Sequence, residues 1–288
     1  MEEYYEQIYD DVFSNIKKGN IDVFLCGAAS TKKKTSYRDL LRNELKNAKR
    51  VSILYPEDLF MELLNRKKYD LLTLEKLLAT NSDYIVIVCE SPGSFTELGA
   101  FVNNSETVDK VIVLLQTKYK NAKSFIRQGP VEYVRSKEKS HVIYYNADIL
   151  EASEKIKKIL YNKNNSGKKQ KDSFKDLNII SGQYNFVLLL LYFYKTLTVK
   201  KLVSYIKSVY EAKEFDMSDF DMIYTAAIRR LFKEGLIKKY NSDNDTGYML
   251  TDKGYDSAMA LLSYVELKGK TKIFDRIRMK ILFSEDKD

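Results

Sequence analysis

Short apolar runs alternate with longer amphipathic segments over the first 161 residues of the chain. The apolar runs are rich in β-branched side chains, which is typical of parallel strands covered by helices on both faces; they occupy residues 21–27, 50–56, 83–90, 109–116 and 141–146. Segments with apolar residues at helical spacing lie between and after them, at 37–49, 70–80, 94–103 and 148–161. The alternation predicts an α/β fold with a doubly wound, mostly parallel, five-stranded sheet.

A second pattern begins after residues 162–176, NKNNSGKKQKDSFKD, whose near-absence of apolar side chains predicts a linker. Helical segments then follow one another at 184–194, 198–210, 218–234 and 251–266, with a two-stranded hairpin before the last. This order is typical of a winged-helix domain, and a basic amphipathic helix at 270–283 follows it. We therefore expect an α/β domain at 1–161, the linker at 162–176, and a mainly helical winged-helix domain at 177–288.

The composition is that of a soluble globular protein with a mild excess of positive charge. Hydrophobic residues make up 44% and charged residues 31% of the chain, and the formal net charge is +8. Residues 1–161 carry 25 basic and 23 acidic side chains, the linker 5 and 2, and the remainder 18 and 15, a weak preference for polyanionic partners. The acidic N-terminus is no signal peptide, and the apolar run 186–193 is too short to cross a bilayer. We expect a cytoplasmic protein without membrane contact.

Several classes of chemistry are excluded by what the chain lacks. Cys26 and Cys89 each end a predicted buried strand, which favours core thiols over a disulfide. The single histidine, His141, leaves little material for a transition-metal site or a Ser-His triad. The turn after the first strand is not GxGxxG, and there is no P-loop. We therefore expect chemistry based on carboxylates, with no cofactor and no metal.

The most informative stretch is CESPGSFTELGAF, at the end of the third predicted strand. Ligands of doubly wound sheets bind at the carboxyl ends of strands, and a tight turn here leads into a helix N-terminus that suits a phosphate or sugar oxygen. Glu97 lies one turn into that helix and could face a ligand. The alternative is a purely structural role, in which Ser94-x-x-Glu97 forms a capping box; the local spacing alone favours this alternative. Arg38, at the start of an earlier helix, is equally a phosphate clamp or a surface ion-pair partner.

Roughly the first 145 residues resemble the nucleoside 2-deoxyribosyltransferase family and its nucleotide N-glycosidase relatives. The matching pieces are FLCG at 24–27, Glu75 eight residues before Asp83, and SPGS at 91–94 leading into TELG at 96–99. The resemblance implies that Glu97 is the nucleophile at the anomeric carbon and Glu75 the acid/base, although the family usually has Asp at the latter position. Such a pair can stabilise or trap an oxocarbenium-like centre and protonate the leaving base. The residues expected at the substrate are Gly27, Arg38, Ser91, Gly93 and Ser94.

The whole chain resembles more closely the effector proteins of bacterial retrons, through LEKLLA at 74–79, ESPGS at 90–94 and the predicted winged helix. This resemblance implies an antiphage toxin that cleaves the glycosidic bond of a nucleotide, with NAD as a leading candidate substrate. It also implies control by a reverse transcriptase and its RNA-linked single-stranded DNA, and we expect a homo-oligomer or a higher assembly.

Contacts with such a partner have candidates in and around the predicted winged helix. Arg229 and Arg230 lie in its third helix, which enters the major groove in proteins of this shape. That helix and the wing at 241–245 are also acidic, which argues against ordinary duplex binding. The better-placed candidates for a protein or structured nucleic acid lie in the linker and the tail: Lys168, Lys169, Lys272 and Arg276.

Two other functions stay open at this point. One is a salvage deoxyribosyltransferase or nucleotide hydrolase, although such enzymes rarely need a winged helix. The other is a DNA-binding regulator whose sugar-binding domain senses a nucleotide without chemistry, although the acidic wing weakens it.

Overall fold

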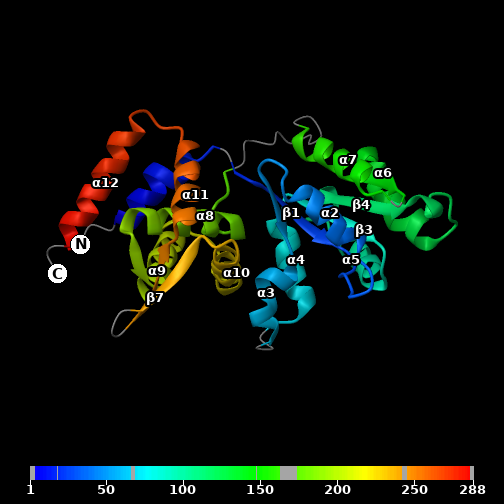
Figure 1. Ribbon diagram of the computed structural model, residues 1–288, viewed down its shortest axis with the longest axis horizontal. Coiled ribbons are helices and arrows are strands. Elements are labelled where there is room, and N and C mark those ends of the chain that lie inside the picture. Colours follow the sequence, from blue (N-terminus) through cyan, green and yellow to red (C-terminus); the bar gives the residue numbers. More distant parts are fainter. Residues whose placement is uncertain are drawn as a thin grey trace. The chain divides into compact units, whose positions relative to one another are not determined.

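A computed structural model describes residues 4–17, 19–65, 69–146, 148–162, 174–241 and 245–285 (Figure 1). The chain forms two compact units. The first, called the sheet unit below, comprises Asn20–Glu57 and Met61–Gln170; the second, called the helical unit, comprises Met1–Gly19, Asp58–Phe60 and Lys171–Asp288. Within the described residues, no helix is long and apolar enough to cross a bilayer.

The sheet unit is built on five parallel strands in the order β2-β1-β3-β4-β5. These are β1 (Ile21–Cys26), β2 (Val51–Leu54), β3 (Tyr84–Cys89), β4 (Val111–Gln116) and β5 (Val142–Tyr145). Strands β1, β3 and β4 are almost wholly buried, because helices cover both of their faces. The expected five-stranded α/β sheet is confirmed.

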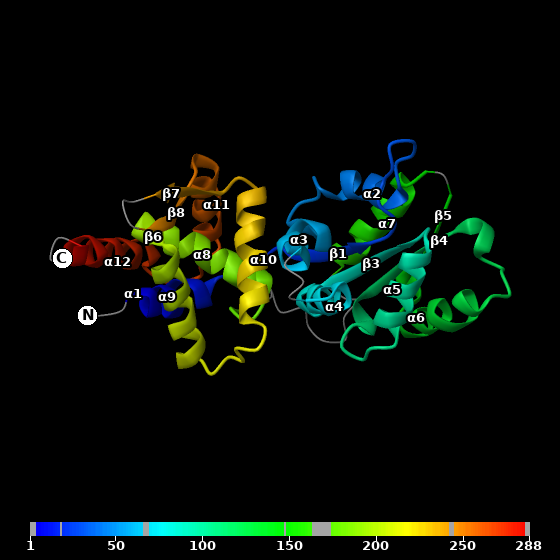
Figure 2. The same ribbon diagram turned by 90° about the horizontal axis from the view of Figure 1, so that it is seen from below.

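Helices cover this sheet on both sides (Figure 2). Helices α2 (Tyr37–Leu45) and α7 (Leu150–Tyr161) contribute to the apolar core on one face. The opposite face is covered by α4 (Leu71–Asn81), α5 (Pro92–Val102) and α6 (Glu132–Lys137), with Phe24 of β1 edge-on to Phe101 of α5 at 5.7 Å. A further helix, α3 (Pro56–Asn65), follows β2. Neither α3 nor α6 was expected from the sequence pattern.

The strand order places a switch point between β1 and β3. The chain leaves β1 toward β2 on one side and returns to β3 on the other, so the connections diverge at the carboxyl ends of β1 and β3. Gly27 follows the first of these strands and Glu90 the second. Crevices at such points bind ligands in doubly wound proteins.

The helical unit combines five longer helices with a small antiparallel sheet. Its helices are α8 (Ile180–Tyr194), α9 (Val199–Ala212), α10 (Phe220–Lys233), α11 (Asp252–Ser263) and α12 (Lys270–Glu285). Strands β6 (Thr196–Thr198), β7 (Ile237–Asn241) and β8 (Thr246–Leu250) pair in the order β6-β8-β7. The helices and the hairpin follow the expected order, and β6 is an additional short strand.

The segment before β1 belongs to the helical unit, whereas the sequence pattern had assigned it to the α/β domain. It forms α1 (Tyr4–Gln7) and the short helices η1 (Ile8–Val12) and η2 (Phe13–Asn15). Its apolar side chains are buried in the same core as those of α8, and the ring centres of Phe13 and Phe186 are 5.2 Å apart. The expected division at residues 162–176 is therefore one of several junctions between the units, and another lies between Gly19 and Asn20. Four further short helices lie in the sheet unit: η3 (Val108–Lys110), η4 (Thr117–Tyr119), η5 (Arg127–Val131) and η6 (Lys139–His141).

The end of the linker is also fixed to the helical unit. The Tyr9 hydroxyl donates to Asp176 Oδ1 at 2.8 Å, and the Tyr210 hydroxyl donates to the Leu177 carbonyl at 2.6 Å. A Cβ on Gly182 would lie 1.7 Å from the Asp176 carbonyl oxygen, so only glycine permits this close approach. The second part of the helical unit therefore starts before residue 177, which was the expected boundary.

Candidate active site

The turn after β3 is closed by a capping box that differs from the expected one. Ser91 is the N-cap of α5, and its Oγ accepts the Ser94 N–H at 3.2 Å. Ser94 Oγ in turn accepts the Ser91 N–H at 3.1 Å and donates to the Ser91 carbonyl at 2.8 Å. The helix begins at Pro92, two residues before the expected start. The box is therefore Ser91–Ser94, and the alternative Ser94–Glu97 box is not formed. Glu97 lies in the second turn of the helix.

Glu97 is poorly suited to a structural role. Its side chain is half-buried, and its Oε2 atom is enclosed without a hydrogen-bond partner among the described residues. Burial, and then the charges of Glu75 and Glu57, raise the pKa of Glu97 to about 7 against the opposing effect of Arg38. An enclosed carboxylate without a partner is costly for a fold, and such perturbed groups cluster at functional sites.

Glu75, on α4, completes a pair of interacting carboxylates. Asp70, five residues before Glu75, caps α4 by accepting the Thr73 N–H at 2.9 Å. Because α4 begins at Leu71, Glu75 lies in its second turn. Burial and then the charge of Glu57 raise the pKa of Glu75 above its usual range. The pair consequently retains a proton at pH values where isolated carboxylates have lost theirs, and it can offer one neutral and one charged group together.

Cys26 forms part of the same environment. The thiol is buried at the end of β1, and its pKa is raised by burial and then by the charges of Glu97 and Glu75. The structure thus brings the ends of β1 and β3 and both predicted catalytic carboxylates into one electrostatic environment. Within the described residues, no group of three His, Cys, Asp or Glu side chains could hold a metal ion.

A third carboxylate, Glu57, was missed by the sequence reasoning. It lies in the first turn of α3, and its Oε1 accepts a hydrogen bond from Arg38 Nη1 at 3.0 Å. Arg38 is buried, with its guanidinium 4.7 Å from the centre of the Tyr55 ring. The signal that could have found Glu57 is Pro56, since proline directly after a strand commonly opens a helix.

Gly27 and Glu90 hold α2 against the ends of β1 and β3. Gly27 has φ +149°, and a Cβ there would lie 2.9 Å from Arg38 Cβ and 3.2 Å from Val88 Cβ. The Glu90 carboxylate accepts the backbone N–H groups of Tyr37 and Arg38, at 3.0 and 3.1 Å. The amides of the first turn of α2 are therefore satisfied by the protein itself. Gly27 has a steric role here, and Glu90 caps a helix across the switch point.

The other expected substrate contacts lie in the first turn of α5. The Ser94 hydroxyl is buried and engaged in the capping box, and Ser91 is half-buried. Gly93 is exposed, and its N–H donates to none of the described residues. Of the amides in this turn, that of Gly93 is consequently open to a ligand oxygen.

The expected partner contacts have different outcomes. Arg230 is 5% exposed, donates to Ser181 Oγ at 3.0 Å and to Glu234 Oε1 at 2.9 Å, and lies over the Tyr184 ring. The structure thus gives Arg230 a packing role, because a partner could reach it only if these contacts broke. Arg229 is half-buried on α10, and Lys272 and Arg276 are exposed on α12. Lys168 and Lys169 lie outside the described residues.

Comparison with known proteins adds the family. The family model described as STM3845 retron effector protein matches residues 34–239. The chain is 32% identical to an Escherichia coli protein named Retron Ec86 putative ribosyltransferase/DNA-binding protein, over 95% of this chain and 87% of that protein. It is 35% identical to the equally named protein of retron Ec73 from Escherichia coli, over 46% of this chain and 43% of that protein. These matches show that the chain belongs to the retron effector family.

Proposed function

We propose that the sheet unit is an N-glycosidase that cleaves the bond between the base and the sugar of a nucleotide. The observation that carries the proposal is the enclosed Glu97 carboxylate, which has no hydrogen-bond partner among the described residues and a pKa near 7 beside Glu75. The ribosyltransferase name of the relatives supports the same class of chemistry. The proposed role is that of a toxin in antiphage defence.

In the proposed reaction, ionised Glu97 attacks the anomeric carbon as the bond from that carbon to the base breaks. The base leaves with the bonding electrons and takes a proton from neutral Glu75. A water molecule then attacks the anomeric carbon, Glu75 takes the water proton, and Glu97 leaves as a carboxylate. Each step uses one charged and one neutral carboxyl group, a combination that a pair sharing one proton can supply when that proton lies on Glu75 rather than on Glu97.

Substrate binding in this proposal uses the Gly93 N–H for a sugar or phosphate oxygen, with Arg38 and Ser91 close by. NAD is the leading candidate substrate because its nicotinamide is bonded to the sugar as a cation and leaves as a neutral molecule. Its departure needs no proton from Glu75, so for NAD an ionised Glu75 would only take the proton of the attacking water. A nucleoside or deoxynucleotide substrate would use the same two carboxylates. No cofactor is required for either.

The test is release of free base from NAD and from deoxynucleotides by the purified protein. Glu97→Gln should lower the rate by several orders of magnitude, because the amide cannot act as the nucleophile. Glu75→Gln should lower it less and change the pH–rate profile. Glu151→Gln, which alters an exposed carboxylate paired with Lys155 at 2.7 Å on α7, is the control. Wild-type turnover retained by Glu97→Gln would refute the proposed mechanism.

We further propose that the helical unit is a winged-helix domain that docks the protein on a reverse transcriptase and its RNA-linked DNA. The family membership and the DNA-binding name of the relatives support this, and α12 presents Lys272 and Arg276 on its exposed side. Changing both residues to alanine should reduce co-purification with the reverse transcriptase complex, most strongly at low salt, because the variant's binding depends less on salt. Equal recovery of variant and wild type would remove α12 from the docking surface.

A further inference from the structure

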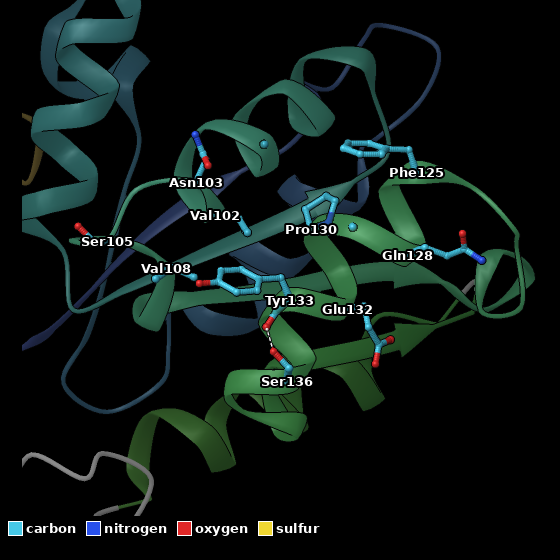
Figure 3. A pocket seen from close by; sticks show the side chains of 12 residues that line it. Val102, Asn103, Ser105, Val108, Phe125, Gln128, Pro130, Glu132, Tyr133 and Ser136 are labelled. Carbon is cyan, nitrogen blue, oxygen red and sulfur yellow. Dashed lines mark hydrogen bonds between the residues drawn. The ribbon is translucent and has the colours of Figure 1, made fainter.

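A groove of about 900 Å³ lies on the sheet unit, and neither Glu75 nor Glu97 lines it (Figure 3). One wall is the C-terminal half of α5, including Val102 and Asn103. The other wall comes from η5 and α6, where Phe125, Pro130 and Tyr133 line the space. We refer to it as the crossover groove, because residues 117–141 form the connection from β4 to β5.

The connection beside the crossover groove is strongly basic. Residues 117–139 contain seven Lys and Arg side chains against two Glu, a net +5 within a chain of net +8. The remainder of residues 1–161 is net negative, since that whole stretch is only +2. Positive charge in the sheet unit is therefore concentrated on one connection.

These charges are exposed and mostly without counter-ions. The two glutamates are occupied: Glu132 accepts from Arg127 at 2.7 Å, and Glu138 caps η6 through Ser140. No carboxylate among the described residues forms an ion pair with the exposed lysines of this connection, which are Lys118, Lys120, Lys123, Lys137 and Lys139. A surface with this much uncompensated charge attracts polyanions.

The lysines lie toward both ends of the connection that forms one wall of the crossover groove, and none of them lines the groove itself. Lys118 and Lys120 directly follow β4, and Lys137 and Lys139 directly precede β5. Because β4 and β5 are parallel, the carboxyl end of one and the amino end of the other lie at opposite edges of the sheet. The basic residues therefore mark a track along the connection rather than a single point.

Exposed aromatic rings lie along the same track. Phe125 is 85% exposed, Tyr133 48% and Tyr119 42%. The Phe125 ring lies against Gly129, with its nearest atom 3.5 Å from the position that a Cβ would take there. Soluble proteins seldom expose so many large rings together without a partner.

We propose that the crossover groove binds a single-stranded polynucleotide, with phosphates on the flanking lysines and unpaired bases on Phe125 and Tyr133. Stacking on aromatic side chains combined with a basic track is the mode by which proteins hold single strands. Paired bases have no free ring face for Phe125, which disfavours a duplex. An acidic protein segment would use the lysines alone and gain little from the rings. The inference goes beyond the proposed function, which assigns no polynucleotide to the sheet unit.

The experiment measures binding of a fluorescent 20-nucleotide oligo-dT to the full chain across a salt series. Lys118→Ala/Lys120→Ala/Lys123→Ala should weaken binding at least tenfold at low salt. It should reduce the slope of log affinity against log salt by about 2, at about 0.7 for each phosphate that a lysine no longer neutralises. The matched control is Lys155→Ala/Lys157→Ala/Lys158→Ala on α7, which removes the same charge from the same unit and should leave binding nearly unchanged.

Phe125→Ala separates nucleic acid from other polyanions. It should weaken oligo-dT binding by about five- to a hundredfold, the range for removal of one base stack, and leave competition by polyglutamate unaffected. Because the side chain is exposed, folding should not change. Equal loss in the two lysine variants, no effect of Phe125→Ala, or equally tight binding of a duplex would each overturn the proposal. None of these measurements depends on base release, so the proposed function can fail independently.

Discussion

At the residue scale, Glu97 combines an unfavourable environment with an expected chemical role. Its pKa near 7 lies above the usual 4.5, chiefly because of burial and then because of Glu75. The folded protein therefore binds a proton on Glu97 that the unfolded chain has lost between these pH values. The stability of the fold consequently falls as pH rises from about 4.5 to about 7, and the cost persists above pH 7.

Glu97→Gln should remove this cost. At pH 8 the variant should have a free energy of unfolding about 1–2 kcal/mol higher than wild type, and therefore a higher unfolding temperature. At pH 4 the two proteins should differ little. Thermal unfolding at both pH values measures it. A variant less stable than wild type at pH 8 would show that the ionised Glu97 supports the fold instead.

Other residues at the site show what the sequence could reveal. Glu97 and Glu75 were predicted from a resemblance in local motifs, and the charge of each acts on the same buried site. Glu57 and the capping role of Glu90 could not be identified in this way. Their partners, Arg38 and the first amides of α2, are distant in sequence and meet them only after the sheet has formed.

At the scale of elements, the five strands were predicted to within a few residues because long buried apolar runs carry a strong signal. The α6 segment was missed because it has few apolar residues and follows the η5 turn, which contains Pro130. Strand β6 has three residues and, within the described part of the chain, is paired with β8 at the edge of its sheet. Elements stabilised by contacts distant in sequence leave little periodicity along the chain.

Helix α2 provides a test of how one element positions another. Glu90→Gln keeps one acceptor oxygen but replaces the other by an amide donor, so either Tyr37 or Arg38 loses its backbone partner. We expect a loss of about 1–2 kcal/mol of stability. We also expect at least a tenfold loss of base release, because Arg38 and the turn before α5 are no longer held together.

The control is Glu138→Gln, since Glu138 also caps a helix with its carboxylate, accepting the Ser140 N–H at 3.1 Å. Urea unfolding and base release are measured for both variants. Should the two variants lose similar stability while both keep wild-type turnover, Glu90 would be a cap and nothing more.

At the scale of the whole molecule, the sheet unit is inserted into the chain of the helical unit. Residues before β1 and after the linker share one core. The sequence could not show this, because the first 16 residues have the pattern of an ordinary amphipathic helix and their partners come more than 150 residues later. The buried side chains of this segment are Tyr5, Ile8, Tyr9, Val12, Phe13 and Ile16.

A chain split in the linker should therefore remain one particle. Fragments 1–166 and 167–288, expressed together, should co-purify, because each buried side chain of the first segment contributes up to about 1.5–3 kcal/mol. The matched control is fragment 20–166, which keeps the sheet unit and lacks the segment. Equal recovery of 1–166 and 20–166 with 167–288 would show that the segment does not hold the fragments together.

The same insertion has a consequence during protein synthesis. The segment that contains Phe13 leaves the ribosome first, while Phe186 and the other apolar partners on α8 are made about 170 residues later. At about 5–20 residues per second this interval lasts roughly 10–30 seconds. The residues of the sheet unit are made during that time, so this unit can begin to fold while the first segment stays without its core. We expect it to be a binding site for nascent-chain chaperones, which removal of residues 1–16 would abolish.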